Sequence, residues 1–141
     1  MRILGLDVGT KRIGVAVSDE LGWTAQGIMT LLRRNGESDL KKIHEIAEQY
    51  GVEKVDVGIP TSMDGSLGPQ AKMTLGFIQD LREVLEIPII TWDERFSTLE
   101  ATKMLIGAGV SRDKRRRTVD MTAAILILQS YLDSLARRER L

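Results

Sequence analysis

The sequence predicts an α/β fold whose five-stranded mixed sheet carries helices on both faces. Two observations predict this fold. Apolar runs from Ile3 to Leu6 and from Ile13 to Val17 flank the turn residues 9–11, as two antiparallel strands joined by a tight turn would. Strand and helix patterns then alternate along the chain, which is typical of strands paired in parallel. We therefore expect a three-strand antiparallel meander followed by two parallel strands.

The third strand of the meander and the first helix follow directly. We expect the strand from Trp23 to Leu31, after a turn at Gly22. The helix should begin at Glu37 or Ser38, and Gly51 is placed to end it. Its apolar residues recur at helical spacing, at Leu40, Ile43, Ala47 and Tyr50. This spacing predicts one buried helix face.

The next strand, helix and strand continue the alternation. A short apolar strand over 55–59 ends at Pro60, because proline cannot donate a hydrogen bond to a continuing ladder. A turn-rich loop over 61–68 precedes Pro69, which suits the first turn of a second helix. The apolar stripe of that helix is Ala71, Leu75, Ile78, Leu81 and Leu85. The fifth strand is expected from Ile89 to Trp92.

Two further helices are expected towards the C-terminus. Ser97 and Glu100 have the spacing of a capping box, which opens a third helix that ends near Gly107 and Gly109. A basic loop should then lead to a last helix from about Arg117 to Ala136. The inner stripe of the last helix is Ala124, Leu128, Tyr131 and Leu135.

Composition excludes several classes of protein. With 43% hydrophobic and 28% charged residues, the 141-residue chain has the composition of a soluble globular protein and suits a single domain over 1–141. The absence of cysteine excludes disulfides and thiolate chemistry. The longest apolar run, Ala123 to Leu128, is too short to span a membrane, and the chain opens on a strand instead of a signal sequence. We therefore expect a cytoplasmic protein with no membrane partner.

Charge is balanced overall but unevenly distributed. The 20 basic and 20 acidic residues cancel, so net charge does not indicate a nucleic-acid-binding protein. Basic residues nevertheless crowd from Arg112 to Arg117 and from Arg137 to Arg140. The first cluster is either one basic face that meets a polyanion or a merely solvated loop.

Three acidic residues are expected to reach the edge where the parallel strands end. Asp7 lies at the end of the first strand among apolar neighbours, so its burial is costly unless its carboxylate has a partner. The segment from Trp92 to Arg95, which holds Asp93 and Glu94, should reach the same edge, as should the loop after Pro60. Asp120 lies one turn before Ala124 on the apolar stripe of the last helix, so helical geometry aims it at the sheet. The sequence permits these residues to meet without requiring it.

Converging carboxylates repel one another unless cations neutralise them. Carboxylate oxygens favour Mg²⁺ or Mn²⁺, and two such ions roughly 3.5–4 Å apart would stabilise the attacking and leaving oxygens of phosphodiester hydrolysis. Zinc is disfavoured because the chain has no cysteine and a single histidine, His44. The pattern indicates metal-dependent nuclease chemistry.

Each acidic residue also has a purely structural interpretation. Asp7 could cap its own turn, and Asp120 could serve only to complement the helix macrodipole. Glu94 could be a surface acid paired with Arg95. The neighbouring Asp93 is the better candidate for such a structural role.

Four separated motifs resemble one known protein family. They are ILGLDVGTKRIGVAVSD at 3–19, VGIP at 57–60 with MDGSLGP at 63–69, WDER at 92–95, and KRRR at 114–117 with VDMTAAILILQSYLD at 119–133. In this order, over essentially the whole chain, they closely resemble the YqgF family, also called RuvX. That family is described as pre-16S rRNA nucleases and Holliday-junction-resolvase-like proteins with an RNase H-like fold.

The resemblance implies an RNase H-like fold and an acidic active-site set of Asp7, Glu94 and Asp120, which would bind Mg²⁺ or Mn²⁺. It implies an endonuclease that hydrolyses phosphodiester bonds in maturation of the 5′ end of 16S rRNA, with precursor rRNA as its partner. The residues expected to position phosphates are Lys11, Arg12, Arg95, Lys114, Arg115, Arg116 and Arg117.

Two other functions remain open at this point. One is resolution of DNA junctions, which requires two active sites on a symmetric substrate and so favours a homodimer over a monomer. The related resolvases have an acidic residue at the end of the fourth strand, where this chain reads Gly58, Ile59 and Pro60. The other function is non-catalytic binding of nucleic acid.

Overall fold

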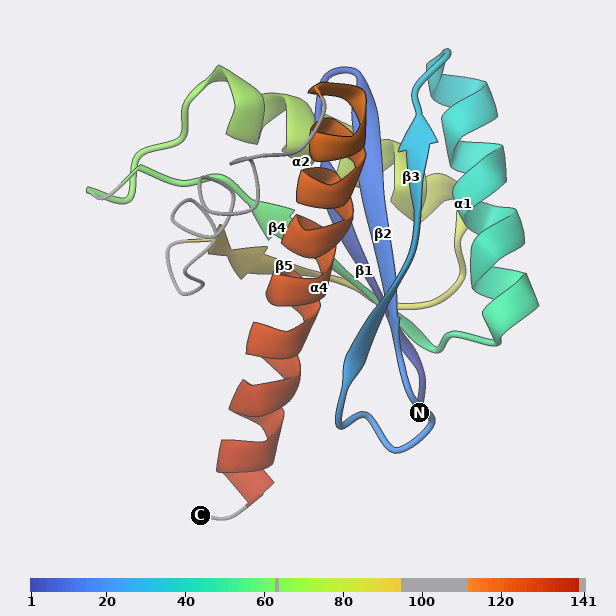
Figure 1. Ribbon diagram of the computed structural model, residues 1–141, viewed down its shortest axis with the longest axis vertical. Helices are drawn as coiled ribbons and strands as arrows, with labels where there is room; N and C mark the ends of the chain where they lie inside the picture. Colours follow the sequence, from blue (N-terminus) through green and yellow to red (C-terminus); the bar gives the residue numbers. More distant parts are fainter. Residues whose placement is uncertain (63, 95–111, 140–141) are drawn as a thin grey trace.

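The computed structural model describes residues 1–62, 64–94 and 112–139. Within these ranges the chain forms a five-stranded sheet in the order β3-β2-β1-β4-β5, with β1 (Ile3–Val8) at its centre (Figure 1). β2 (Arg12–Ser18) pairs antiparallel with β1, and β3 (Ala25–Leu32) pairs antiparallel with β2. β4 (Lys54–Ile59) and β5 (Ile89–Asp93) continue the sheet in parallel on the other side of β1. The predicted meander and the two parallel strands are confirmed.

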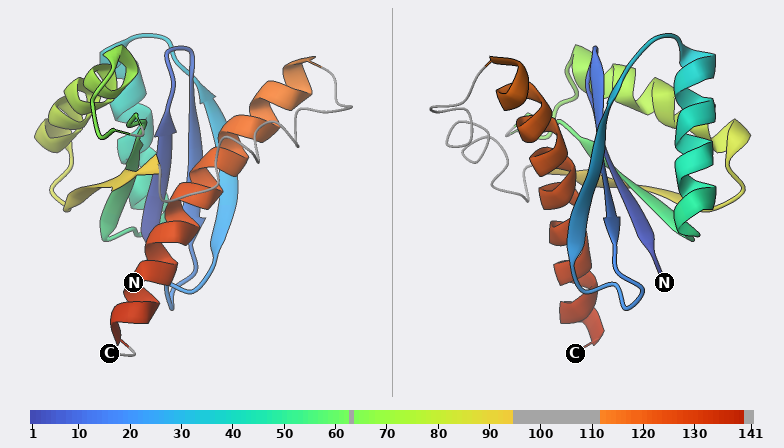
Figure 2. Two further views of the ribbon diagram at one scale, coloured as in Figure 1. Left: turned by 90° about the vertical axis from the view of Figure 1, so that its left-hand side faces the viewer. Right: turned by 45° about the vertical axis from the view of Figure 1, so that its right-hand side comes forward.

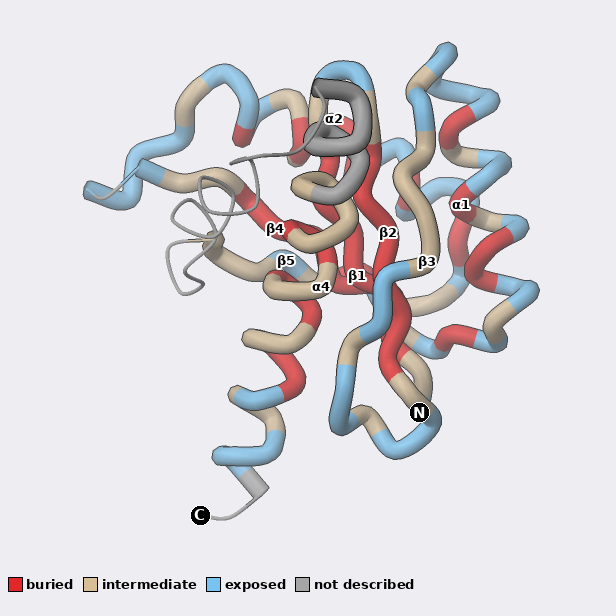
Figure 3. The backbone as a smooth tube through the Cα atoms, viewed as in Figure 1, coloured by how far each residue is buried: buried red, intermediate tan, exposed pale blue. Residues whose placement is uncertain are grey.

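Helices cover both faces of the sheet, as predicted. α1 (Gly36–Tyr50) and α2 (Pro69–Val84) lie on one face, and α4 (Arg112–Glu139) crosses the other (Figure 2). Buried residues run through β1, β2 and β4 and along the inner sides of the helices (Figure 3). The core therefore lies in two layers, one on each face of the sheet.

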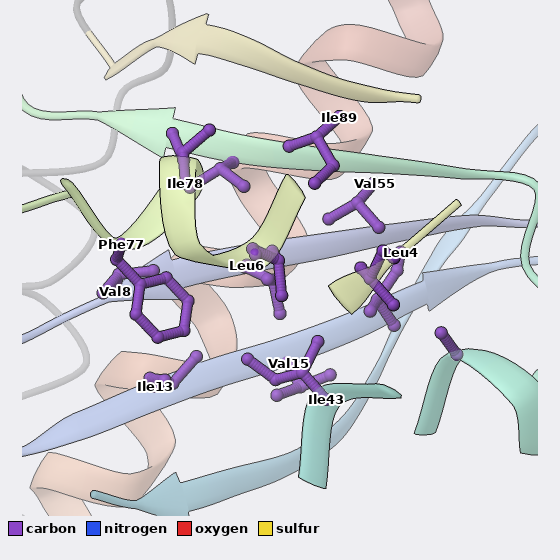
Figure 4. Close-up of a cluster of buried hydrophobic side chains, with 14 of the residues drawn as sticks. Leu4, Leu6, Val8, Ile13, Val15, Ile43, Val55, Phe77, Ile78 and Ile89 are labelled. Carbon is purple, nitrogen blue, oxygen red and sulfur yellow. The ribbon is translucent and has the colours of Figure 1, made fainter. Parts of the chain in front are cut away.

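The two layers differ in size and in the residues that form them. Facing α1 and α2 is a large cluster that includes Leu4, Leu6, Val8, Ile13, Val15, Ile43, Val55, Phe77, Ile78 and Ile89 (Figure 4). Facing α4 is a smaller cluster of Ile3, Ala16, Ala124, Leu128, Tyr131 and Leu132. Because successive residues of a strand point to opposite faces, positions 3, 5 and 7 of β1 point to the same face. Asp7 therefore shares the α4 face with Ile3.

α1 begins and ends at local signals. Asn35 caps its start, since the side-chain oxygen of Asn35 accepts a hydrogen bond of 2.8 Å from the backbone N–H of Ser38. Gly51 ends the helix with a φ of 62°, a left-handed backbone conformation that residues other than glycine adopt only at an energetic cost. The predictions that Gly51 ends this helix and that Pro69 opens α2 are confirmed.

β3 begins later than predicted. The backbone N–H groups of Trp23 and Thr24 donate to the Asp19 carboxylate, at 2.7 and 3.3 Å, so both residues belong to the turn after β2. The strand therefore runs from Ala25 to Leu32 instead of from Trp23 to Leu31.

α4 begins earlier than predicted. Its first residue is Arg112, so the expectation of a basic loop is wrong over 112–116, where the backbone is helical. Arginine and lysine favour helices, and this stretch has no glycine or proline to interrupt one. The predicted third helix, with its capping box at Ser97 and Glu100, lies outside the described residues.

One segment of α4, Val119–Arg138, is long and apolar enough to cross a membrane by composition alone. In the structure this segment packs against the sheet through Ala124, Leu128 and Leu132, so it serves as a core helix. No other helix in the described ranges meets the same criterion.

Glycines in the strands allow α4 to approach the sheet closely. A Cβ atom at Gly5 would lie 2.7 Å from the Cβ of Leu128, and one at Gly14 would overlap the carbonyl oxygen of Asp120. Neither position can accept a side chain unless α4 moves away. These glycines therefore set the depth at which α4, and Asp120 with it, lies on the sheet.

Candidate active site

Asp7 lies near the end of the central strand and is only 8% exposed. Gly5, two residues before it, faces Leu128 of α4, so alternation directs Asp7 to the α4 side as well. Val8, which follows, belongs to the opposite core layer. The structure thus places this carboxylate beneath α4, at the end of β1 that adjoins the β1–β2 turn.

Glycine flanks Asp7 on both neighbouring strands. Asp7 pairs with Gly14 of β2. On the other side, Leu6 pairs with Val57 of β4, and the next step of this parallel register brings Gly58 beside Asp7. With no side chain at either glycine, the sheet surface on both sides of Asp7 is open to other groups.

Asp120 lies over the first of these glycines. Its carbonyl oxygen occupies the place that a side chain at Gly14 would need. Asp120 is partly buried and lies one helical turn before Ala124, which is fully buried against the sheet. The backbone at Asp120 therefore lies on the sheet-facing side of α4.

Glu94 lies beside the second glycine, which the Ile127 side chain of α4 covers. It follows β5 directly, and its Oε1 atom lies 3.0 Å from the position of a Cβ at Gly58. Every second residue of a strand points to the same face, so Asp93 points to the same side of the sheet as Ile89. Ile89 faces α2, so Asp93 is directed away from α4. Glu94, not Asp93, therefore shares the α4 face with Asp7.

The three acidic residues thus follow one row across the sheet. Asp120 lies over Gly14, Asp7 itself comes next, and Glu94 lies beside Gly58. Adjacent strands are about 4.8 Å apart, so the row is short. Within the described residues, however, no three acidic or histidine side chains are close enough together to hold a metal ion. The row brings the residues to one place without arranging their side chains as a finished coordination sphere.

A polar cleft of about 310 Å³ adjoins this row. It is lined by Gly9, Thr10, Lys11, Arg12, Gln70 and Asp120. The four residues from Gly9 to Arg12 form the tip of the β1–β2 hairpin, which is closed by a hydrogen bond of 2.8 Å from the Gly9 N–H to the Arg12 carbonyl. Two of the cations predicted to position phosphates, Lys11 and Arg12, are therefore next to Asp120.

Arg33 holds the hairpin tip in place. Its guanidinium donates to the Gly9 carbonyl at 3.0 Å and forms an ion pair of 3.2 Å with Asp39 of α1. It also lies over the Phe77 ring of α2, at 5.1 Å from the ring centre. The backbone N–H of Arg33 donates to the Lys11 carbonyl at 2.9 Å. The tip is thereby fixed to both helices on the far face, which steadies one wall of the cleft.

The remaining predicted phosphate contacts are only partly visible. The backbone from Lys114 to Arg117 forms early turns of α4, on the same helix as Asp120 and N-terminal to it. Their side chains, and the whole of Arg95, lie outside the described part of the chain.

The sequence analysis missed one buried acid on the same sheet face. Asp56 of β4 is completely buried, and neither of its carboxylate oxygens has a hydrogen-bond partner. Burial raises the pKa of Asp56 to about 8, against the opposing effect of the Lys54 charge. The only signal in the sequence was a charged residue in the middle of an apolar strand. The cleft residues Thr10 and Gln70 carried no signal.

Comparison with known proteins agrees with this architecture. A family model described as RuvX, Holliday junction resolvase, matches residues 1–134. A relative from Bacillus pumilus is 50% identical over 137 residues, which cover 96% of this chain and 99% of the relative. A relative from Desulforamulus reducens is 52% identical over 137 residues, covering 97% of this chain and 100% of the relative. Both carry the name "Putative pre-16S rRNA nuclease".

Solved structures share the fold at low sequence identity. Thermus thermophilus RuvC in complex with a Holliday junction substrate matches with a TM-score of 0.62 at 17% identity, covering 99% of this chain and 96% of that one. The fowlpox virus resolvase in complex with Holliday junction DNA matches with a TM-score of 0.57 at 16% identity, covering 96% and 99%. The predicted RNase H-like fold is confirmed. The chain belongs to the RuvX family of resolvase-like nucleases, enzymes that hydrolyse phosphodiester bonds.

Proposed function

We propose that this chain is a metal-dependent endonuclease, formed by a single RNase H-like domain over 1–141, that acts in the cytoplasm on precursor rRNA in maturation of the 5′ end of 16S rRNA. The names of its relatives support the substrate. The observation that carries the chemistry is the buried Asp7 between two glycines, with Asp120 over one and Glu94 beside the other.

Asp7, Glu94 and Asp120 would hold the metal. Their oxygen donors suit Mg²⁺ or Mn²⁺, and a cation would offset the repulsion among carboxylates gathered on one row. Such an ion, when bound, activates water and neutralises negative charge that develops on the phosphate. No described trio of acidic side chains is close enough together to bind an ion in this structure. The carboxylates would therefore have to draw together when an ion binds.

The rest of the site would position the substrate. Lys11 and Arg12 offer positive charge beside Asp120 and would hold the sugar-phosphate backbone. Arg33 keeps their hairpin at a constant place relative to the sheet. We extend the same role to Arg95 and to the four residues Lys114, Arg115, Arg116 and Arg117. Positioning of this kind lowers the barrier to reaction by fixing the phosphate relative to the carboxylates.

The proposal is tested by cleavage of a precursor 16S rRNA fragment with Mg²⁺ or Mn²⁺. Asp7→Asn should lower the cleavage rate by at least about 100-fold and leave the fold intact, because it removes one negative donor at constant size. Asp80→Asn, which changes an exposed acid on α2, is the matched control and should cleave like the wild type. Undiminished cleavage by Asp7→Asn would remove the metal-site model.

Resolution of DNA junctions is the second candidate, favoured by the fold shared with RuvC and the fowlpox virus resolvase. A four-way DNA junction tested beside the RNA decides between the two substrates. Symmetric cleavage of the junction by a homodimer, with no cleavage of RNA, would support the resolvase. Cleavage by a monomer would agree with the rRNA nuclease, and tight binding without cleavage of either substrate would indicate a non-catalytic binding factor.

A further inference from the structure

The polar cleft passes over the tip of the β1–β2 hairpin and connects the two faces of the sheet. Asp120 reaches it from α4, whereas Gln70 reaches it from the first turn of α2 on the opposite face. The hairpin stands between these two helices (Figure 2). A nucleic-acid strand that leaves the acidic row by this route would therefore pass Lys11 and Arg12 before it meets Gln70.

The two cations in the cleft are available to a phosphate. The ion pairs found among the described residues involve Arg2, Arg33 and His44, and neither Lys11 nor Arg12. Lys11 is exposed and Arg12 is partly exposed. A phosphate held here would lie beside Asp120.

Gln70 adds a neutral group to the cleft that can both donate and accept hydrogen bonds. Its side chain is exposed, and the side-chain hydrogen bond found at Gln70 among the described residues is the one from the Thr74 hydroxyl to the Gln70 backbone carbonyl, which leaves the side-chain amide available. Thr10, whose hydroxyl can also both donate and accept hydrogen bonds, lines the same cleft. The lining contains no aromatic residue, so a base has no ring to stack on. The group next to a bound phosphate is the sugar, and the 2′-hydroxyl of ribose is both a donor and an acceptor.

We propose that Gln70 hydrogen-bonds the ribose 2′-hydroxyl of the nucleotide whose phosphate is held by Lys11 and Arg12, and that this contact makes the protein prefer RNA to DNA. Gln70 is in this view a specificity-determining residue. The inference rests on the proposed nuclease function and specifies how its substrate class is recognised.

Binding measured without cleavage tests this contact. Fluorescence anisotropy would compare an RNA hairpin from the precursor with its all-deoxy counterpart, with Ca²⁺ in place of Mg²⁺. Gln70→Leu should weaken RNA binding roughly fivefold to tenfold, as expected for loss of one hydrogen bond, and leave DNA binding unchanged. Gln79→Leu, an exposed glutamine further along α2, is the matched control and should change neither affinity. Thermal unfolding would check that both variants fold.

Single 2′-deoxy substitutions in the RNA identify the nucleotide concerned. The 2′-deoxy substitution at one position should weaken binding of the RNA to the wild type. The same substitution should not change binding to Gln70→Leu, because that variant already lacks the partner of the hydroxyl. Equal losses for RNA and DNA, no loss for either, or a loss that follows base identity would each overturn the inference.

Failure of this inference differs from failure of the proposed function. If RNA is cleaved by the wild type and spared by Asp7→Asn, the nuclease stands whatever Gln70→Leu does. If the wild type neither binds nor cleaves RNA, both proposals fall together.

Discussion

Asp56 shows how much one buried side chain can set the pH response of the protein. Its carboxyl group lies under α4 with neither oxygen bonded, and burial raises its pKa from 3.8 to about 8. Among the described residues, the charge that opposes this shift is that of Lys54 on the same strand, whose Nζ donates to the Tyr131 hydroxyl of α4 at 3.1 Å. At neutral pH Asp56 is therefore a neutral acid in the folded state.

Replacement of Asp56 by asparagine should stabilise the protein in a pH-dependent way. Between about pH 4 and 8 the folded state keeps a proton that the unfolded state releases, so wild-type stability falls as pH rises through this window. Asp56→Asn removes the linkage, and its advantage should grow with pH by at most about 1.4 kcal/mol per unit and level off above pH 8. Urea unfolding at pH 5, 6, 7 and 8 measures it. A constant difference between the two proteins across this range would contradict the account, and Asp80→Asn is the exposed control.

At the scale of elements, the site depends on the contact between the β1–β2 hairpin and α4. A glycine at position 14 lets the backbone of Asp120 rest on β2, and a glycine at position 58 leaves room for Ile127 of α4 with Glu94 beside it. The two helices on the far face hold the hairpin through Arg33. The distance between the hairpin and α4 is therefore set by backbone packing. If a substitution pushes α4 away from the sheet, side-chain rearrangement cannot restore that distance.

A methyl group at position 14 should consequently impair the site. In Gly14→Ala the new Cβ would overlap the Asp120 carbonyl oxygen, so α4 must move away from Asp7. A shift of about 1 Å at a catalytic group can cost roughly 100-fold in rate, and we expect a cleavage loss of that size together with a lower melting temperature.

Gly76→Ala provides the control for this change. Gly76 lies in α2 with no atom within 4 Å of an added Cβ, so the substitution should stabilise the protein by up to about 1 kcal/mol and leave cleavage unchanged. Wild-type cleavage rates in Gly14→Ala would show that the position of Asp120 on the sheet does not matter.

At the scale of the whole molecule, a chain with no net charge binds nucleic acid only if its cations gather on one face. The described structure places Lys11 and Arg12 beside Asp120, and the backbone from Lys114 to Arg117 belongs to the same helix as Asp120. The substrate would therefore meet positive charge around the acidic row, although the average surface is neutral.

The salt dependence of binding tests this arrangement. In Lys11→Gln/Arg12→Gln, affinity for RNA and for DNA should fall together, because phosphate contacts carry no sequence or sugar information. The slope of log affinity against log salt concentration should become shallower, by an amount that corresponds to the loss of up to about two phosphate contacts. Lys41→Gln/Lys42→Gln, which removes two exposed charges from α1, should leave the slope unchanged. Equal slopes for all three proteins would exclude a phosphate contact at the hairpin tip.

Local sequence signals determined most of the fold. Alternating apolar residues, the cap at Gly51 and the proline at position 69 are local signals, and the meander and the two parallel strands could be predicted from such signals taken in order along the chain. Four separated motifs, the first of them around Asp7, pointed to the family. Where a competing local interaction was overlooked, the boundary was wrong: the Asp19 carboxylate draws Trp23 into a turn, and helix-forming arginines extend α4 back to Arg112.

Tertiary structure alone decided which residues meet. That Asp93 and Glu94 point to opposite faces follows from the register of β5, and Gln70 joins Asp120 only because a hairpin separates their helices by the width of one cleft. Asp56 became a buried neutral acid because α4 covers it. These relations join residues far apart in the chain through backbone packing. Sequence patterns within a few residues do not depend on that packing, so these long-range relations can be seen only in the folded molecule.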